Sequence, residues 1–301
     1  MWSNVRRQPP HRAQRNGLVA CALIGLSWIQ LLPGNAFALN RPANLRYVGT
    51  QSEAAAKPTA ANTGWQPTGV TLTPSGAISV TKDGTVIDSK DVAGEITIQA
   101  SNVIVRRCRV RSASYYPIRI SSGTNILIED TEVDGMGGAS KAVLIEGGQV
   151  TLRRMNIHDS EDGLSLNGSG GLTIVDNYVH SPRHSASGHS DGFELYSGAH
   201  MVIRNNNFDY AGANTSASNF SNWAGAIDDV TYDHNWLSGG TYNLYIDGSF
   251  STRDAISNIR VTNNRWIRGS AVYGTHVVRG TLSNIVWSGN VFDDNDEVIS
   301  K

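Results

Sequence analysis

Short apolar runs that alternate with polar residues recur along most of this 301-residue chain. Each run is rich in valine and isoleucine and is bounded by glycine, asparagine or serine, which is typical of β-strands. The clearest runs lie at 172–179, 201–208, 230–237, 259–266 and 285–292. Each carries one asparagine at the same position, and these recur about every 29 residues: Asn177, Asn206, Asn235, Asn264 and Asn290.

The same frame extends upstream to 103–110, 126–133 and 150–157, with Cys108, Thr131 and Met155 in the asparagine column. A fixed period of this size indicates a repeat architecture, because each unit buries its apolar face only against the next. The sequence therefore predicts an all-β, single-domain parallel β-helix of about eight to ten coils. Stacked coils would place the asparagines one above another as a hydrogen-bonded ladder.

Charged residues beside the asparagine column support this register. Two positions before it the chain reads Arg106, Glu129 and Arg153, so opposite charges become neighbours when coils stack. We expect these side chains to lie on a solvated outer face.

A second strand precedes the asparagine frame in most coils, at 96–98, 118–120, 143–145, 164–166, 193–195, 244–246 and 276–278. We call it the front strand. No register is assigned to the coil around 224–229. Alternation points the following front-strand residues away from the core: Thr97, Gln99, Arg119, Ser121, Leu144, Glu146, Ser165, Asn167, Glu194, Tyr196, Tyr245, Asp247, Val277 and Arg279. Long loops at 180–192, 209–223 and 247–254 would form the walls of a cleft beside this face.

The first 38 residues have the features of a secretory signal peptide. Four arginines precede an apolar run at 17–32, and Ala36-Phe37-Ala38 supplies a cleavage pattern of small residues. Residues 39–64 are proline- and alanine-rich and are interpreted as a linker, which leaves 65–301 for the β-helix domain. The protein is therefore expected to be secreted or periplasmic, with no membrane attachment after cleavage.

The charge balance argues against a nucleic-acid partner. Loss of the signal peptide removes four of 25 basic residues and none of the 26 acidic ones, which leaves a net charge of about −5. Of the two cysteines, Cys21 leaves with the signal peptide and Cys108 remains alone. Stability must then come from the stacked coils and not from a disulfide.

The chain resembles the secreted right-handed parallel β-helix proteins of the pectate-lyase-like superfamily. It is especially similar to a bacterial branch that carries an IHxxEDG coil followed by an H-[SN]-DG coil. Here these are Ile157 to Gly163 and His189-Ser190-Asp191-Gly192, after an opening Thr68-Gly69-Val70 with LTPSG at 72–76. The resemblance extends from about Trp65 to Phe292. It implies the fold, within a superfamily that contains lyases, hydrolases, epimerases and proteins without catalytic activity.

Candidate catalytic residues gather between 158 and 245. Asp162 and Asp191 each precede a glycine at the entry to neighbouring front strands, which would place them on adjacent coils. Acidic turn chemistry alone could account for the two aspartates. The full candidate set is His189, Asp191, Asp162, Glu194, Tyr245 and Tyr196.

Three functions fit these residues. A polysaccharide lyase acting on a uronate-containing glycan needs a cation for the carboxylate, a base, and an acid for the leaving oxygen. Arg119, Lys141 or Arg279 could neutralise the uronate carboxylate. His189 or Tyr245 could be the base, and Tyr196 or Tyr245 could be the acid that protonates the leaving oxygen. An inverting glycoside hydrolase, with two carboxyls roughly 6.5–9.5 Å apart, or a C5-epimerase is the first alternative. A non-catalytic surface solenoid that binds glycans is the second.

The expected partner is an anionic polysaccharide. Besides the three cations, candidate substrate-binding residues are Trp223, Tyr242, Tyr273 and Asp247, and the three aromatic rings would stack on sugars. No cofactor is certain, although Asp134, Asp162, Asp191, Asp209 and Glu194 offer oxygen ligands suited to Ca²⁺. His158, His180 and His189 could hold Zn²⁺. In the repeat frame, Asp134, His158, His180 and Asp209 share one column, which makes these four the leading metal candidates.

Overall fold

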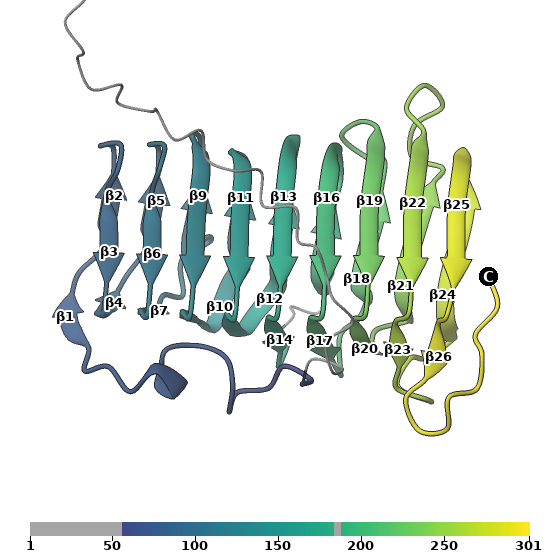
Figure 1. The fold of residues 1–301 in the computed structure, drawn as a ribbon, viewed down its shortest axis with the longest axis horizontal. Helices are drawn as coiled ribbons and strands as arrows, with labels where there is room; N and C mark the ends of the chain where they lie inside the picture. The colour runs from purple at the N-terminus through teal and green to yellow at the C-terminus, as the bar shows by residue number, and fades with distance from the viewer. Residues whose placement is uncertain (1–55, 184–187) are drawn as a thin grey trace, which may run out of the picture. The chain divides into compact units, whose positions relative to one another are not determined.

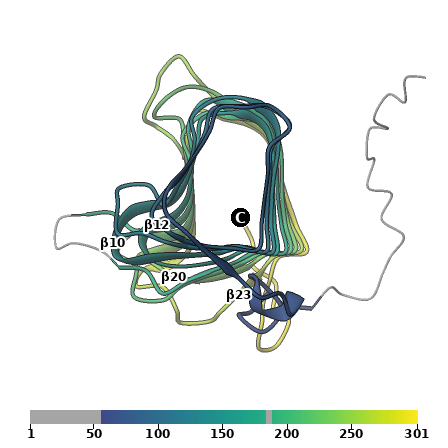
Figure 2. The same ribbon diagram turned by 90° about the vertical axis from the view of Figure 1, so that its left-hand side faces the viewer.

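The computed structural model describes residues 56–183 and 188–301, and the proposed signal peptide lies outside them. These residues form a parallel β-helix, whose stacked coils overlie one another when viewed along the axis (Figures 1 and 2). Within the described ranges no helix has the length and apolar character to cross a membrane. A single short 3-10 helix, η1 (Gln66–Thr68), precedes the first coil.

Each coil contributes three strands, and strands of one kind pair in parallel from coil to coil. The front strands are β2 (Ile78–Val80), β5 (Ile96–Ile98), β8 (Ile118–Ile120), the second halves of β10 (Glu132–Ile145) and β12 (Asn156–Leu166), β15 (Asp191–Leu195), β18 (Ser216–Ser221), β21 (Tyr242–Gly248) and β24 (Gly274–Gly280).

The middle strands form a nine-stranded sheet, which comprises β3 (Val86–Asp88), β6 (Ile104–Arg106), β9 (Thr124–Glu129), β11 (Gly148–Arg153), β13 (Ser169–Val175), β16 (Gly198–Arg204), β19 (Ile227–Asp233), β22 (Ile256–Thr262) and β25 (Leu282–Ser288). The last strands are β1 (Thr73–Ser75), β4 (Lys90–Ala93), β7 (Arg109–Arg111), the first halves of β10 and β12, β14 (Tyr178–His180), β17 (Asn207–Tyr210), β20 (Trp236–Gly239), β23 (Arg265–Trp266) and β26 (Val291–Phe292).

The predicted asparagines lie at the corner between the middle and last strands, and all five are fully buried. The Asn177 Nδ2 group donates to Oδ1 of Asn206 at 2.8 Å, and the same bond joins Asn206 to Asn235, Asn235 to Asn264, and Asn264 to Asn290, each at 3.0 Å. Each Oδ1 also accepts the backbone N–H of the asparagine one coil before it. The amide stack therefore fixes both the turn and the register.

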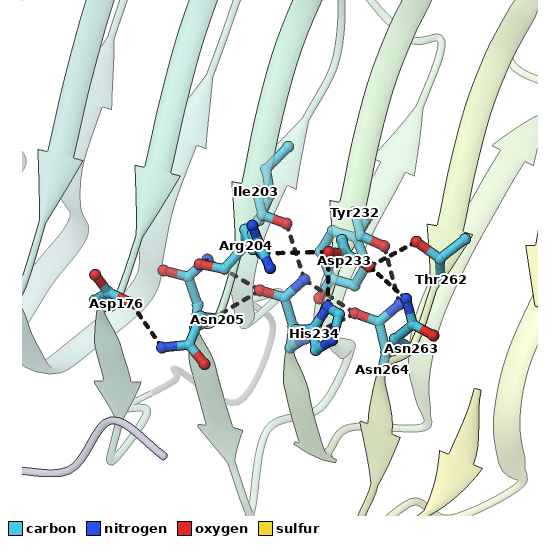
Figure 3. A network of polar contacts seen from close by, with 12 residues as sticks. Asp176, Ile203, Arg204, Asn205, Tyr232, Asp233, His234, Thr262, Asn263 and Asn264 are labelled. Carbon is cyan, nitrogen blue, oxygen red and sulfur yellow. Dashed lines mark hydrogen bonds and ion pairs between the residues drawn. The ribbon is translucent and has the colours of Figure 1, made fainter. Parts of the chain in front are cut away.

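A polar network lies outside this ladder (Figure 3). The residue before each ladder asparagine has a left-handed backbone, with φ of 60° at Asp176, 52° at Asn205 and 54° at His234. Asparagine, aspartate and histidine tolerate this conformation better than most residues. Asp233 accepts hydrogen bonds from Thr262 at 2.7 Å and Asn263 at 2.9 Å, so the outer side chains also join consecutive coils.

The outer charges pair largely as the register predicts. Glu129 lies 2.6 Å from Arg153, and Asp130 lies 2.6 Å from Arg154. Arg106 turns to Asp88 on the preceding coil, at 2.9 Å. These ion pairs are partly exposed, so each contributes little stability alone.

The coil that the sequence left without a register is resolved by β18. This front strand occupies Ser216–Ser221, inside the stretch that we interpreted as the loop 209–223. Its inward residues include Ser218, which is fully buried and bonds to Tyr232 at 2.7 Å, beside Phe220. Small polar residues in the core disguised the strand, because the apolar alternation that marks its neighbours is missing.

Residues 57–64, expected to be a linker, contact the outside of the last strands. The Asn207 Nδ2 group donates to the Pro58 carbonyl at 2.9 Å, and the Gly64 N–H donates to Arg154 O at 2.8 Å. Just beyond, Trp65 Nε1 donates to Glu132 at 2.8 Å. The segment therefore joins several coils before the chain enters β1.

We predict that Asn235→Ala lowers the free energy of unfolding by several kcal/mol, because each buried group left without a partner costs roughly 1–3 kcal/mol. Asn167→Ala is the matched control, since Asn167 is exposed and lies outside the ladder. It should change stability by less than about 0.5 kcal/mol. Urea unfolding followed by circular dichroism measures both, and equal losses would contradict a stabilising ladder.

Candidate functional site

The front strands align polar side chains from consecutive coils on the outside of the core. Leu144, Ser165, Glu194, Asn219 and Tyr245 are paired in that order across β10, β12, β15, β18 and β21. The outward direction of Leu144, Ser165, Glu194 and Tyr245 agrees with the sequence prediction, whereas Asn219 lies on β18, the front strand that the sequence did not reveal. Ser165 and Glu194 are nevertheless almost completely buried, because neighbouring side chains cover them.

Three carboxyl groups meet beside this column. Asp162, Asp191 and Glu194 each offer an oxygen, and these oxygens lie within 4.8 Å of one another. The Lys141 Nζ group lies 2.8 Å from Asp162 Oδ2 and also forms an ion pair with Glu194 Oε2. One ammonium group therefore bridges carboxylates from two further coils.

Further donors complete the cluster. Ser165 Oγ donates to Glu194 Oε2 at 2.9 Å, and the Tyr196 hydroxyl donates to Glu194 Oε1. The Asp191 N–H donates to Asp162 Oδ1 at 3.0 Å, while Ser216 Oγ donates to Asp191 Oδ1. Asp191 Oδ2 has only a long contact, 3.5 Å from Asn219 Nδ2.

Burial and mutual repulsion change the protonation of this cluster. Burial, with the nearby charge of Glu194, raises the pKa of Asp162 from 3.8 to about 7. The same causes raise the pKa of Asp191 well above its ordinary value, and burial beside Glu194 raises the pKa of the Tyr196 hydroxyl. Burial alone lowers the pKa of Lys141, but Glu194 and Asp162 raise it above its ordinary value. The site thus combines an ammonium group with two aspartic acids that keep their protons to higher pH than usual.

A cleft of about 620 Å³ lies over the cluster. Trp223 and Phe250 line one part of it, with ring centroids 6.0 Å apart, and both side chains are largely exposed. The predicted site residues that line the cleft are Lys141, His189, Asp191, Tyr196, Trp223, Tyr245, Asp247 and Arg279. Asn167, Thr215, Asn219, Ser221, Ala224 and Phe250 complete it.

The hydrogen bonds around Tyr245 show that its hydroxyl group acts as a donor. Thr241 Oγ1 donates its one hydrogen to the Thr215 carbonyl at 3.0 Å, so the Tyr245 hydroxyl donates to Thr241 at 2.8 Å. Burial raises the pKa of Tyr245, which keeps the phenol neutral. Thr215 Oγ1 also accepts the Ser190 N–H at 3.3 Å, so this chain of contacts leads to the residue beside His189.

The two predicted arginines are both held by carboxylates. Arg279 lies 2.6 Å from Asp247, whose side chain is almost fully buried while that of Arg279 is mostly exposed. Asp247 thus orients Arg279 toward the cleft. Arg119 lies 2.8 Å from Glu146, outside the residues that line the cleft. Tyr242 packs beside Tyr245 and Tyr273, with centroids 5.4 Å and 5.9 Å apart.

The column predicted for a metal is only partly assembled. His158 Nδ1 lies 4.0 Å from Asp134, and the rings of His158 and His180 stack 5.2 Å apart. Both His180 nitrogens are occupied, by Ser181 at 2.8 Å and Asn156 at 3.0 Å. Asp209 instead accepts a hydrogen bond from Ser238 at 2.7 Å.

Asp159, which the sequence analysis did not select, joins His158 at 2.8 Å. Burial opposes protonation of His158, but the carboxylates of Glu132, Asp159 and Asp134 raise its pKa. A protonated imidazole cannot bind a metal through either nitrogen. A metal at this position would have to displace that proton.

The Asp162, Asp191 and Glu194 cluster has the oxygen donors that Ca²⁺ prefers. Lys141 already places a positive charge against two of the three carboxyls, however, and five of their six oxygens accept a hydrogen bond or ion pair of ordinary length or shorter. Binding of Ca²⁺ here would require movement of Lys141. The side chains fit an internal lysine counter-ion better than a calcium site.

Comparison with known proteins identifies the architecture. A model of the right handed beta helix region matches residues 68–253 and 141–299. The chain belongs to the right-handed β-helix family. No curated protein matches this β-helix chain.

Solved structures resemble the right-handed β-helix in fold. The catalytic unit of a thermostable GH87 alpha-1,3-glucanase from Streptomyces thermodiastaticus strain HF3-3 has 12% identity and a TM-score of 0.48, over 74% of this chain and 50% of that chain. Pectate lyase Pel9A has 15% identity and a TM-score of 0.42, over 76% of this chain and 72% of that chain. The alginate lyase from Paenibacillus sp. str. FPU-7 has 13% identity and a TM-score of 0.38, over 70% of this chain and 99% of that chain. The β-helix chain spans only half of the glucanase unit.

We predict a pH-dependent stability that originates in Asp162. Its native pKa of about 7 exceeds the ordinary 3.8, so the folded β-helix holds a proton that the unfolded chain releases between these values. The stabilisation of the folded state by this bound proton is fully present below about pH 4 and is lost as pH rises through about 7. Asp162→Asn lacks this titration. Between about pH 4 and pH 7 its free energy of unfolding should therefore rise, relative to that of wild type, by up to about 1.4 kcal/mol per pH unit. Urea unfolding at several pH values measures the difference, and parallel pH profiles would refute the assignment.

Proposed function

We propose that this protein is a secreted carbohydrate-active enzyme, a polysaccharide lyase that cleaves a uronate-containing glycan by β-elimination. The supporting observation is that His189, Tyr245 and Arg279 line one cleft, above the buried carboxyls. They are a potential base, a neutral phenol and an exposed cation, the three kinds of group that β-elimination needs.

In the proposed reaction, Arg279 binds the uronate carboxylate, for which its planar guanidinium is suited. Asp191, which lines the cleft with a raised pKa, donates a second hydrogen bond to that carboxylate in its protonated form. Neutralisation of the carboxylate acidifies the neighbouring C–H group. This arrangement gives Asp191 a positioning and electrostatic role and leaves proton removal to His189.

His189 takes the proton next to the carboxylate, and the electron pair of that C–H bond forms a carbon–carbon double bond. The bond from the adjacent carbon to the glycosidic oxygen breaks, and Tyr245 donates a proton to this oxygen. Tyr245 is the better acid of the two candidate tyrosines, because Tyr196 donates its hydrogen to buried Glu194. Rotation of the Tyr245 hydroxyl from Thr241 toward the cleft supplies the proton.

Inverting hydrolysis fits the geometry less well. It requires two carboxyls roughly 6.5–9.5 Å apart, with a water molecule between them. One oxygen from each of Asp162, Asp191 and Glu194 lies within 4.8 Å of the other two, and Lys141 bridges Asp162 and Glu194. This close spacing favours the lyase over the inverting hydrolase.

A substrate screen tests the proposal. Purified protein is incubated with uronate-containing and neutral polysaccharides, and ultraviolet absorption of unsaturated ends is followed beside a reducing-end assay. A lyase generates both signals together. New reducing ends without unsaturation would indicate a hydrolase. Altered stereochemistry without cleavage would indicate an epimerase, and binding without turnover would indicate a glycan-binding protein. Each of these three outcomes would overturn the proposal.

We predict that His189→Asn lowers kcat on the cleaved glycan by about 10²–10⁴-fold, the usual contribution of a general base. Binding of the glycan should change little, because Arg279 and the aromatic walls remain. His200→Asn makes the same change at an exposed histidine of β16, outside the cleft, and should leave kcat unaltered. A His189→Asn enzyme with wild-type kcat would remove His189 from the mechanism.

A further inference from the structure

Tyr115, Tyr116 and Arg119 form a patch before and on β8 that the cleft does not include. Tyr115 is 64% exposed, and its ring lies edge-on to that of Tyr116, with centroids 4.7 Å apart. The Arg119 guanidinium lies 5.6 Å from the Tyr116 ring centroid. The patch therefore combines exposed aromatic surface with a cation that the second ring supports.

Arg119 keeps part of its donor capacity. Its Nε and Nη2 groups both contact one oxygen of Glu146, at 2.9 Å and 2.8 Å. The side chain is still 42% exposed. A guanidinium with five N–H donors can hold one carboxylate oxygen and still bind a further hydroxyl or carboxylate.

The patch lies one coil before the coil of Lys141, at one end of the cleft. The Lys141 N–H donates to the Tyr115 carbonyl at 3.1 Å, so Tyr115 lies one coil from Lys141, which lines the cleft. Arg119 pairs with Leu144 and shares a column with Ser165 and Glu194. Three strand spacings separate Arg119 from Glu194, roughly 14 Å, a length that accommodates a few sugar units.

The opposite end of the face has a corresponding arrangement. Arg279 lies on β24, three strands beyond Glu194 in the order β15, β18, β21, β24, and it is also paired with a carboxylate one strand closer to the centre. Arg279 lines the cleft together with the exposed rings of Trp223 and Phe250, as Arg119 lies beside Tyr116 and the exposed Tyr115. Cationic and aromatic groups therefore lie on both sides of the buried carboxyls.

We propose that Tyr115, Tyr116 and Arg119 form a distal subsite for the same anionic glycan, and that the enzyme engages an internal segment of a long chain and cleaves within it. The inference rests on the proposed function, since the ligand is the substrate of that cleft. Tyr115 stacks on a sugar ring, and Arg119 binds a hydroxyl or carboxylate of that sugar. A chain bound from Arg119 to Arg279 has sugars on either side of the reacting bond.

The test compares substrates of different length. Tyr115→Ala and Arg119→Ala should each raise KM for a long uronate polymer by about fivefold to tenfold. KM for an oligosaccharide too short to reach beyond the cleft should be unchanged. Arg260→Ala is the matched control, because Arg260 is exposed on β22 away from the front strands, and it should alter neither value. Early products of wild type should be oligosaccharides of mixed length.

Affinity for the uncleaved polymer is measured in parallel, by gel retardation with the same polymer. If both variants retain wild-type KM and affinity for the polymer, or if short substrates are affected equally, the distal subsite is refuted. Release of products of one size from chain ends would refute internal cleavage. Polymer binding that depends on Tyr115 and Arg119 without any unsaturated product would uphold the subsite and reject the lyase.

Discussion

Hydrogen bonding between stacked asparagine side chains holds successive coils in one register, and every contact in the cleft depends on that register. A shift of one residue in any front strand would reverse the direction of its side chains. Glu194 would then enter the core, and Phe193 would face the cleft. The ladder opposes this shift, because a change of register would break the Asn177–Asn206 bond and its successors, and with them the Nδ2 bonds to backbone carbonyls such as that of Leu152.

The register gathers charges that the chain separates widely. Lys141 and Glu194 are 53 residues apart, yet they form one buried ion pair. A buried carboxyl without a partner would lose its charge or destabilise the fold, so Lys141, Ser165 and Tyr196 make the arrangement sustainable. The same crowding raises the pKa of Asp162 and Asp191, which gives the cleft acidic protons near neutral pH. The register of the coils therefore determines both the stability of the buried charges and the pKa values of the two aspartates.

Much of the fold could be predicted from the sequence, because the repeat has a strong physical signal. Asparagine recurrence and alternation located the corner and most front strands. The strand Ser216–Ser221 escaped, because the polar Ser218 occupies an inward position that usually carries an apolar residue.

The residues of the candidate site could be predicted better than the hydrogen bonds and ion pairs between them. Alternation identified Glu194, Tyr196 and Tyr245 as outward, and the Asp-Gly pairs placed Asp162 and Asp191 on neighbouring coils. Lys141 was expected to contact the substrate, and it lines the cleft; its ion pairs with Asp162 and Glu194 are contacts that a lone lysine before a strand does not reveal. Ser165 was recognised only as outward, and Ser216 and Asn219 were missed because their roles depend on the register of a neighbouring strand.

The central claim, that stacked coils bring Lys141 and Glu194 into one buried pair, is tested most directly by a double-mutant cycle. Free energies of unfolding are measured for wild type, Lys141→Met, Glu194→Gln and the double variant. Lys141→Met should cost about 3–5 kcal/mol, because it leaves the buried Glu194 carboxyl without its cation. Glu194→Gln should cost less, because Lys141 keeps its ion pair with Asp162. The double variant should be more stable than the sum of the two losses implies, by more than about 1 kcal/mol. Losses that add to within about 0.5 kcal/mol would show that the two side chains do not interact, and would contradict the account.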